Sequence, residues 1–379
     1  MARIVLSPYL VRYPLGGMNQ SILGWMHGLS DLGHEVFVVE RSTGSNECYD
    51  PVKRLMTDDC EYGISVVGEL LDSRGFGDRW CFVDAHGRHH GLDEKTLNGL
   101  LRTADVFVGM LWKEWLDEAS GCGLRVFVDG EPGYFQMELA TEGANDCDST
   151  AYDYYFTTGL NMGAGDCTAP TAGLTWRPVL SPISVSRFAV AESPPDAPFT
   201  TVMNWRSHKT IQFQGLRYGQ KDVEFLKFLE LPSRTTANLE VAASGRVPED
   251  QLVAAGWRVR DADRVAATVE SYLAYIASSR GEFSVAKNVF VATNCGEFSE
   301  RSGCYLASGR PVVAQETGFS RHVPCGRGLF AVRNEEEAAA ALDDINTDYE
   351  RHSRWAREIA REYLDAERVM RSVLNGIGL

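Results

Sequence analysis

The sequence predicts an α/β protein of two domains, each built on a mostly parallel sheet, and three observations support this. The chain has 379 residues, and at roughly 100–200 residues per domain this length suits two domains with separate cores. Strand-like apolar segments alternate with helix-like ones, which is typical of parallel sheets covered by helices on both faces. The densest proline cluster, at 192–198, lies near mid-chain and is the best linker candidate.

The first forty residues predict a βαβ unit. The apolar run 3–7 has strand length, and the turn residues 13–17 follow it. Apolar side chains then recur at helical spacing until Gly33, and 34–40 read as the next strand. Two more strands are expected at 104–110 and 124–129.

The second half repeats the alternation. Strands are expected at 199–204, 257–259, 289–292 and 311–315, and helices at 222–229, 266–277, 299–308, 335–342 and 349–374. We therefore expect an N-terminal domain of residues 1–190, a C-terminal domain of residues 199–379, and a ligand cleft between them.

The charge balance narrows the function classes. Fifty-two acidic side chains oppose 37 basic ones, giving a formal net charge of −15. Tight nucleic-acid binding needs a basic face that contacts several phosphates, so it is not expected as the main activity. No run of apolar residues is long enough for a membrane span, and the N-terminus reads as a strand, so a cytoplasmic protein without a transmembrane segment is expected.

The cysteine and histidine patterns predict neither a disulfide framework nor a metal site. The nine cysteines are scattered, with no Cys-x-x-Cys spacing, so we expect reduced, mostly buried thiols. His86, His89 and His90 form the one histidine cluster, and the glycines beside them indicate a polar hairpin turn.

A glycine pair lies between the first strand and the first helix. Gly16, Gly17 and Asn19 belong to a segment where backbone can approach a ligand, and a helix N-terminus suits phosphate or carboxylate. We interpret these three residues as an acceptor or phosphate loop. A tight turn that binds nothing is the alternative.

The segment 296–330 carries the strongest pattern. Ser299 is a suitable N-cap for a helix that Gly309 ends, and Pro311 leads into the next strand. A short loop with Gly318 follows, and a glycine-rich turn at 326–328 precedes another apolar strand.

This order of elements resembles the donor-binding half of GT-B glycosyltransferases, especially the retaining family 4 type. The opening strand, Gly-Gly segment, helix and Leu-Gly-His-Glu-Val strand resemble the start of the same enzymes. The resemblance is to a diverged branch similar to spore-coat-type glycosyltransferases. It implies two facing Rossmann-like domains, with acceptor on the N-terminal side, sugar nucleotide on the C-terminal side, and a C-terminal helix that packs back toward the N-terminal domain.

The chain departs from the family pattern at the donor site. The family has two glutamates separated by seven residues, the second of which holds the ribose; here the two positions are Gly296 and Cys304. Glu297 and Glu300 lie nearby and are possible substitutes. The family's glutamate after the glycine loop is Arg321 here.

Candidate donor-binding residues gather in the C-terminal half. Basic side chains and a helix N-terminus suit a diphosphate, and the backbone of the Gly318 loop suits sugar hydroxyls. The candidates are Arg206, Lys221, Arg280, Glu282, Lys287, Arg301, Ser302, Thr317 and Gly318. The alternatives are solvated surface charges for the cations and an ordinary turn for the loop.

Catalytic candidates lie where a central N-terminal strand ends. Asp129 and Glu131 can orient or deprotonate an acceptor hydroxyl if they face the cleft. A turn-capping role is the alternative. Gly159 and Asn161 are candidates for the acceptor side, and Trp176 and Trp205 are candidates for stacking on a ligand.

Together these features predict a hexosyltransferase, of the retaining type that the resemblance implies, acting on small-molecule donor and acceptor. It moves a sugar from a nucleotide-diphosphate sugar to a hydroxyl, with that sugar nucleotide as co-substrate and no metal or other cofactor. A GT-B-fold sugar-nucleotide epimerase and an inactive sugar-nucleotide-binding protein are the alternatives. Residues 48–120 point to no particular acceptor.

Overall fold

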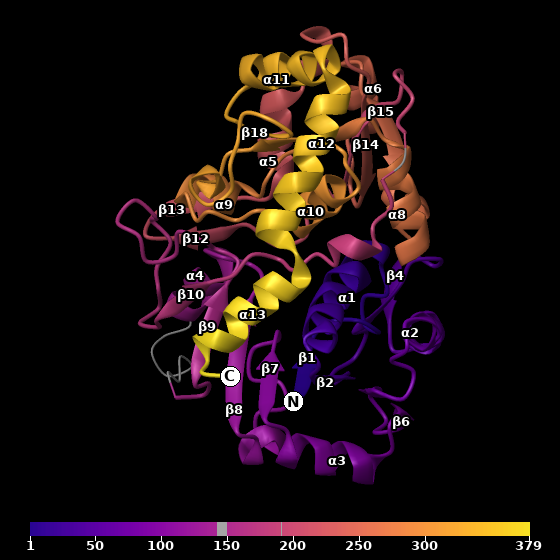
Figure 1. Cartoon of the computed structure of the whole chain (residues 1–379), viewed down its shortest axis with the longest axis vertical. Coiled ribbons are helices and arrows are strands. Elements are labelled where there is room, and N and C mark those ends of the chain that lie inside the picture. Colours follow the sequence, from indigo (N-terminus) through magenta and orange to yellow (C-terminus); the bar gives the residue numbers. More distant parts are fainter. Residues whose placement is uncertain (142–149, 191) are drawn as a thin grey trace.

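The computed structural model describes residues 1–141, 150–190 and 192–379. Two α/β domains lie one above the other in Figure 1, each built on its own sheet. The first sheet takes strands up to Pro178, and the second begins at Phe199. The predicted α/β fold class is confirmed.

The N-terminal sheet has eight strands in the order β10-β9-β8-β7-β1-β2-β5-β6. All neighbours pair in parallel except β5 and β6. Its strands are β1 (Arg3–Ser7), β2 (Glu35–Arg41), β5 (Trp80–Val83), β6 (His89–Gly91), β7 (Val106–Gly109), β8 (Leu124–Asp129), β9 (Tyr154–Thr157) and β10 (Trp176–Pro178). Its helices are α1 (Gly16–Asp31), α2 (Glu61–Ser73), α3 (Glu94–Thr103) and α4 (Tyr134–Thr141). The order places β1 and β8 near the middle, where their carboxyl ends can face a ligand.

The C-terminal sheet has six parallel strands in the order β15-β14-β11-β16-β17-β18. They are β11 (Phe199–Asn204), β14 (Leu239–Ser244), β15 (Arg258–Asp261), β16 (Gly281–Ser284), β17 (Val312–Gln315) and β18 (Leu329–Val332). The helices are α5 (Lys221–Phe225), α6 (Glu249–Ala254), α7 (Ala262–Val265), α8 (Val269–Ser278), α9 (Asn288–Thr293), α10 (Glu300–Ala307), α11 (Glu335–Thr347), α12 (Tyr349–Ile359) and α13 (Ala366–Gly376). Two small hairpins, β3 (Cys48–Asp50) with β4 (Leu55–Thr57) and β12 (Ile211–Phe213) with β13 (Leu216–Tyr218), lie outside both sheets.

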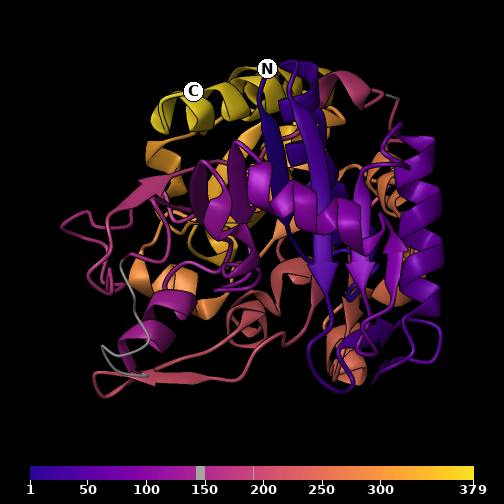
Figure 2. The same ribbon diagram turned by 90° about the horizontal axis from the view of Figure 1, so that it is seen from below.

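The C-terminal helices connect the two domains. The single helix expected at 349–374 is wrong in one respect: α12 ends in a π-helical turn, and Asp365 has extended backbone before α13 begins. This break redirects the chain, so that α13 lies on the lower domain in Figure 1. Met370 and Leu374 there join the core of the N-terminal domain. The expected return of a C-terminal helix to the N-terminal domain is confirmed, and Figure 2 shows both chain ends at the same edge.

Two other local expectations are wrong. The segment 289–292 forms part of the helix α9, not a strand, and Asn294 ends that helix in the left-handed conformation. Short apolar runs do not distinguish buried strands from buried helices. Gly16 and Gly17 lie within the first turn of α1, not in a loop.

The cysteines also differ from expectation. Cys48 and Cys60 form a disulfide, because the β3–β4 hairpin brings Cys48 beside the start of α2. The six other described cysteines are free, and Cys147 lies outside the described residues. The histidine cluster does form the predicted hairpin, β5–β6, where Asp84 pairs with Arg88 and His90. Among the described residues, no helix is long and apolar enough to cross a membrane.

Candidate functional site

A cleft of about 730 Å³ lies between the two domains. Residues at or just beyond the carboxyl ends of β8, β11, β16 and β17 line it, together with the start of α1 and the start of α10. Open parallel sheets bind ligands at this end of their strands, because the loops there face a crevice. The cleft is therefore the candidate functional site.

Three cations from the C-terminal domain line this cleft: Lys221, Lys287 and Arg301, here called the cation cluster. Lys221 begins α5, Lys287 is the N-cap residue of α9, and Arg301 lies in the first turn of α10. The C-terminal sheet places β11 beside β16 and β16 beside β17, so that residues 80 positions apart in sequence meet in one place.

The surroundings of the cation cluster favour an anion. Burial, together with the charges of Arg301 and Lys287, lowers the pKa of Lys221 to about 7. Glu297 lies in the same group, and its burial raises its pKa to about 7 against the opposing charge of Lys221. A bound phosphate would stabilise the protonated ammonium of Lys221, since opposite charge favours the ionised form.

Arg301 is held in one orientation. Its Nε donates to Glu282 at 2.6 Å, its Nη1 donates to the carbonyl of Val202 at 2.9 Å, and its Nη2 donates to Ser284 at 2.5 Å. Glu282 is fully buried behind Arg301 and does not line the cleft. Its role in the structure is to fix the guanidinium, which presents a preformed positive charge to the cleft.

The N-terminus of α10 faces the same space. Ser299, Glu300, Arg301 and Ser302 all line the cleft, and the N-cap residue Ser299 makes no side-chain hydrogen bond to the helix. The first N–H groups of a helix have no partner within the helix and carry partial positive charge. This end of α10 therefore adds to the field of the cation cluster.

Glu131 belongs to the N-terminal domain and contacts the cation cluster of the other domain. Each of its carboxylate oxygens lies 2.5 Å from Nζ of Lys287, and one lies 3.5 Å from Nε2 of His208. Burial alone would raise the pKa of Glu131, but Lys287 and His208 lower it to about 2. His208 packs on Tyr134 with ring centroids 4.9 Å apart. Sequence reasoning missed His208, which lies in an irregular loop with no motif.

Asp129 lies outside the cleft that Glu131 lines. It is buried and accepts hydrogen bonds from Gln136 at 2.7 Å, from Thr157 at 2.8 Å and from the backbone N–H of Glu131 at 2.8 Å. Burial raises its pKa to about 6, although these hydrogen bonds oppose the rise. Asp129 does not line the cleft. Its geometry matches the turn-capping alternative, and it orients the segment that carries Glu131.

The N-terminal side of the cleft is aromatic and apolar. Tyr9, Tyr13, Met18 and Trp25 line it, and the rings of the two tyrosines meet edge to face at 5.2 Å. A bound molecule on this side therefore contacts mainly apolar surface. These side chains were not among the predicted site residues, because their exposure to the cleft depends on how the two domains meet.

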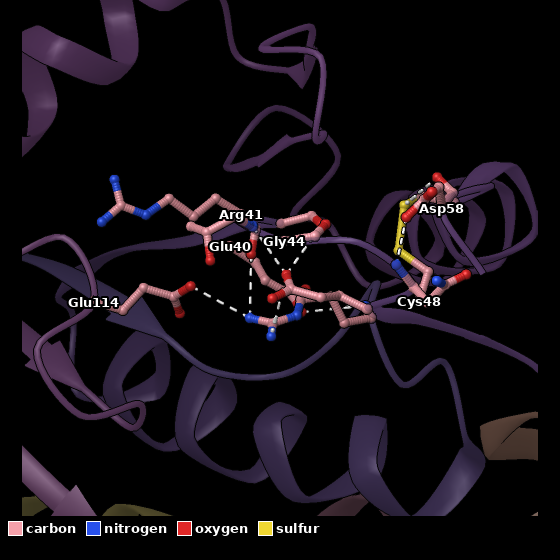
Figure 3. A network of polar contacts seen from close by, with 12 residues as sticks. Glu40, Arg41, Gly44, Cys48, Asp58 and Glu114 are labelled. Atoms are coloured by element: carbon pink, nitrogen blue, oxygen red, sulfur yellow. Dashed lines mark hydrogen bonds and ion pairs between the residues drawn. A yellow bond between two sulfur atoms is a disulfide. The ribbon is translucent and has the colours of Figure 1, made fainter. Parts of the chain in front are cut away.

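A buried carboxylate positions this aromatic loop. Glu40, at the end of β2, accepts hydrogen bonds from the backbone N–H groups of Leu10, Val11 and Arg12 at 3.0, 2.6 and 3.1 Å. Burial raises its pKa to about 7 against these hydrogen bonds. Figure 3 shows Glu40 within a network that reaches Glu114 and lies close to the Cys48–Cys60 disulfide.

The fourteen predicted site residues divide into two groups. Seven of the fourteen line the cleft: Gly17, Glu131, Lys221, Lys287, Arg301, Ser302 and Thr317. The other seven do not: Gly16, Asn19, Asp129, Arg206, Arg280, Glu282 and Gly318.

Partners elsewhere explain why some cations lie outside the cleft. Arg280 stacks on the ring of Tyr349 at 3.4 Å and contacts the linker at Ser193. Arg206 is 64% exposed and pairs with Asp222. Arg206 is thus a surface ion pair, as the alternative for these cations anticipated, whereas Arg280 is buried and fits neither interpretation.

Several other candidate residues lie in contacts between the two domains or are buried in the core. A Cβ on Gly16 would lie 2.2 Å from the carbonyl oxygen of Thr268, and one on Gly318 would lie 2.2 Å from Nδ2 of Asn161. Asn161 donates to the carbonyls of Asn294 at 3.0 Å and Gly318 at 3.3 Å, so it joins the domains and does not line the cleft. Asn19 is buried in α1, and Trp176 and Trp205 are buried among other aromatic rings.

Among the described residues, no group of three or more histidine, cysteine or acidic side chains is arranged to hold a metal ion. The cation cluster and the N-terminus of α10 bring positive charge to the cleft.

Comparison with solved structures identifies the architecture. The chain is similar to an alpha-glucosyltransferase in complex with UDP (TM-score 0.60, 11% identity, 100% of both chains covered). It is also similar to HepE from Anabaena in complex with UDP and glucose (TM-score 0.58, 12% identity) and to sucrose-phosphate synthase from Thermosynechococcus elongatus (TM-score 0.54, 14% identity), each covering 100% of this chain and 99% of the other. Another alpha-glucosyltransferase structure contains UDP and a 13-mer DNA.

These similarities confirm the predicted GT-B fold. No protein-family model matches the chain, and no curated protein matches it significantly in sequence. The low identities agree with the predicted divergence.

Proposed function

We propose that this protein is a glycosyltransferase that moves a sugar from a nucleotide-diphosphate sugar to a hydroxyl group of an acceptor. The observation that carries the proposal is the convergence of Lys221, Lys287 and Arg301 on one cleft beside the N-terminus of α10. Fixed positive charge stabilises the negative charge that develops on a leaving diphosphate. The fold shared with UDP-bound glycosyltransferase structures supports the same reading.

The two sides of the cleft suit different substrates. The cation cluster suits the donor diphosphate, while Tyr9, Tyr13 and Trp25 offer apolar surface to the body of an acceptor. Glu131 extends from the N-terminal side into the cleft, where a carboxylate can accept a hydrogen bond from an acceptor hydroxyl. Enclosure between domains excludes water that would otherwise hydrolyse the donor.

The proposal also specifies the nucleotide, the sugar and the stereochemistry of transfer. UDP is the nucleotide to test first, since two neighbours were solved with it. We propose that the sugar is a hexose and that its anomeric configuration is retained; NMR spectra of the product made from UDP-glucose would identify the anomer. We also propose that no metal or further cofactor is needed, which predicts unchanged turnover in EDTA.

The partners and location belong to the proposal as well. We propose small-molecule substrates and no nucleic-acid partner, because the net charge of −15 opposes polyanion binding. The alpha-glucosyltransferase solved with DNA makes duplex DNA the necessary comparison in a binding assay. We also propose a cytoplasmic location, in which a disulfide such as Cys48–Cys60 is rare. Cell fractionation would test it.

A two-stage experiment tests the proposal. Thermal shifts with UDP, dTDP, GDP and ADP would identify the nucleotide, since a ligand that binds only the folded state raises Tm. Transfer and hydrolysis would then be assayed with the corresponding nucleotide sugars. If none of the four raises Tm, the donor site is refuted. Binding without turnover would indicate an inactive binding protein, and an isomerised sugar nucleotide would indicate an epimerase.

A further inference from the structure

The carboxylate of Glu131 occupies the part of the cation cluster that faces the N-terminal domain. Its two oxygens are equidistant from Nζ of Lys287, at 2.5 Å, and His208 approaches one of them to 3.5 Å. Both partners belong to the C-terminal domain, while Glu131 directly follows the central strand β8 of the other domain. Two oxygens on one ammonium resemble the contact that phosphate oxygens make with lysine.

Lys287 has little freedom to serve two anions. Its side chain is only 10% exposed, and its ammonium lies over the ring of Phe290 at 5.5 Å. A diphosphate oxygen and the Glu131 carboxylate would therefore compete for the same ammonium. Two anions at that position would repel each other, because like charges a few ångströms apart interact unfavourably.

We propose that Glu131 is an internal occupant of the diphosphate site, which a nucleotide donor must displace from Lys287. The inference rests on the proposed function, since it assumes that a diphosphate binds the cation cluster. Displacement leaves the carboxylate on the N-terminal side of the cleft, beside Gly130 and Thr158, which also line it. There it can accept a hydrogen bond from an acceptor hydroxyl. Donor binding thus prepares the acceptor site, and the donor binds first.

The first test is the affinity for UDP of the Glu131→Gln variant. An internal competitor reduces the apparent affinity for UDP. The apparent affinity equals the intrinsic affinity multiplied by the fraction of molecules in which the site is free. If the ion pair is formed about 90% of the time, the variant binds UDP about tenfold more tightly than the wild type. The same variant loses transfer activity, because the amide no longer acts as a carboxylate toward the acceptor. If Glu131 had a purely structural role, its replacement would not both tighten UDP binding and slow transfer.

Glu35→Gln is the matched control. It removes the same charge from an exposed pair with Arg3 in the N-terminal domain, outside the cleft. We expect its UDP affinity and its transfer rate to equal those of the wild type. Isothermal titration of all three proteins at one salt concentration gives the comparison.

A double-mutant cycle assigns the effect to Lys287. In a Lys287→Ala background, Glu131→Gln should give no gain in UDP affinity, because the ammonium for which the two anions compete is gone. A gain of the same size in both backgrounds would overturn the proposal, as it would show a general charge effect.

The remaining outcomes separate the inference from the proposed function. If UDP binds neither the wild type nor Glu131→Gln, the proposed function fails with UDP as donor. If UDP binds both equally, or binds the variant more weakly, the inference is overturned and the proposed function stands. A crystal structure of the wild type with UDP provides the test if the variant does not fold. Glu131 still in contact with Lys287 there would overturn the inference.

Discussion

The thiol of Cys304 donates a hydrogen bond of 2.9 Å to a carboxylate oxygen of Glu300, one turn earlier on α10. Cys304 is the position at which the family resemblance places a ribose-binding glutamate, and it is buried. Glu300 lies at the start of the helix and lines the cleft. An acidic group thus lies one turn earlier on α10, at the cleft, where the thiol of Cys304 holds it.

Glu300 should make stability depend on pH. Burial raises its pKa to about 7, against the hydrogen bond from Cys304 and the charge of Arg301. A carboxyl group whose folded-state pKa is raised favours folding below its unfolded pKa, and this contribution is lost as pH rises through 7. We expect Glu300→Gln to raise the free energy of unfolding at pH 8 by about 2 kcal/mol and to leave it nearly unchanged at about pH 4, below the unfolded pKa. Thermal denaturation at both pH values measures this; an equal change at both would contradict it.

Lys221 should control the pH dependence of diphosphate binding. Its lowered pKa of about 7 means that the ammonium deprotonates as pH rises from 7 to 9. Wild-type affinity for UDP should therefore fall over this range, whereas Lys221→Met should bind roughly 10–100-fold more weakly at pH 7 and show little pH dependence. Arg206→Met is the control, because Arg206 lies outside the cleft. Equal losses in the two variants would argue against a specific role for Lys221.

The Cys48–Cys60 disulfide should stabilise the N-terminal domain. It joins cysteines 12 positions apart, and a loop of this size is expected to contribute about 3 kcal/mol by restricting the unfolded chain. Reductant should lower the Tm of the wild type but not that of a Cys48→Ser, Cys60→Ser variant. A similar fall in both proteins would mean that the response comes from elsewhere.

Gly16 and Gly17 should differ sharply when replaced by alanine. A Cβ on Gly16 would lie 2.2 Å from the backbone oxygen of Thr268 in the other domain, whereas one on Gly17 would lie 3.6 Å from the ring of Tyr272. We expect Gly16→Ala to destabilise the protein by about 2 kcal/mol or more. Gly17→Ala should be neutral or slightly stabilising, because alanine favours helices. Chemical denaturation compares the pair, and equal stabilities would contradict close domain packing at Gly16.

Local sequence predicted most of the scaffold well. The strands β8 and β11 have the predicted bounds, and α10 lies within the predicted 299–308, because apolar runs, an N-cap serine and a stopping glycine act over a few residues. The four apolar residues at 289–292 fit either a strand or a helix, so their pattern predicts a strand where the structure has α9. The break at Asp365 carries no proline or glycine, so the pattern gave no sign of it.

The candidate site was only partly predictable. Lys287 and Arg301 follow recognisable strand ends and helix starts, so their place at the cleft could be expected. Arg280 has the same local signal but stacks on Tyr349, 69 positions later, and no local pattern encodes that partner. Tyr9 and His208 were missed because their exposure to the cleft depends on how the two domains meet.

The sequence by itself determined the α/β class, the alternation of strands and helices and the residues at most strand ends, since these depend on short-range periodicity and turn chemistry. Tertiary structure alone decided which polar groups meet. It paired Glu131 with Lys287 across 156 positions, buried Asp129 beneath the turn, and joined Cys48 to Cys60. The physical reason is that charge pairing, burial and disulfide formation depend on distances through space, which long-range packing sets.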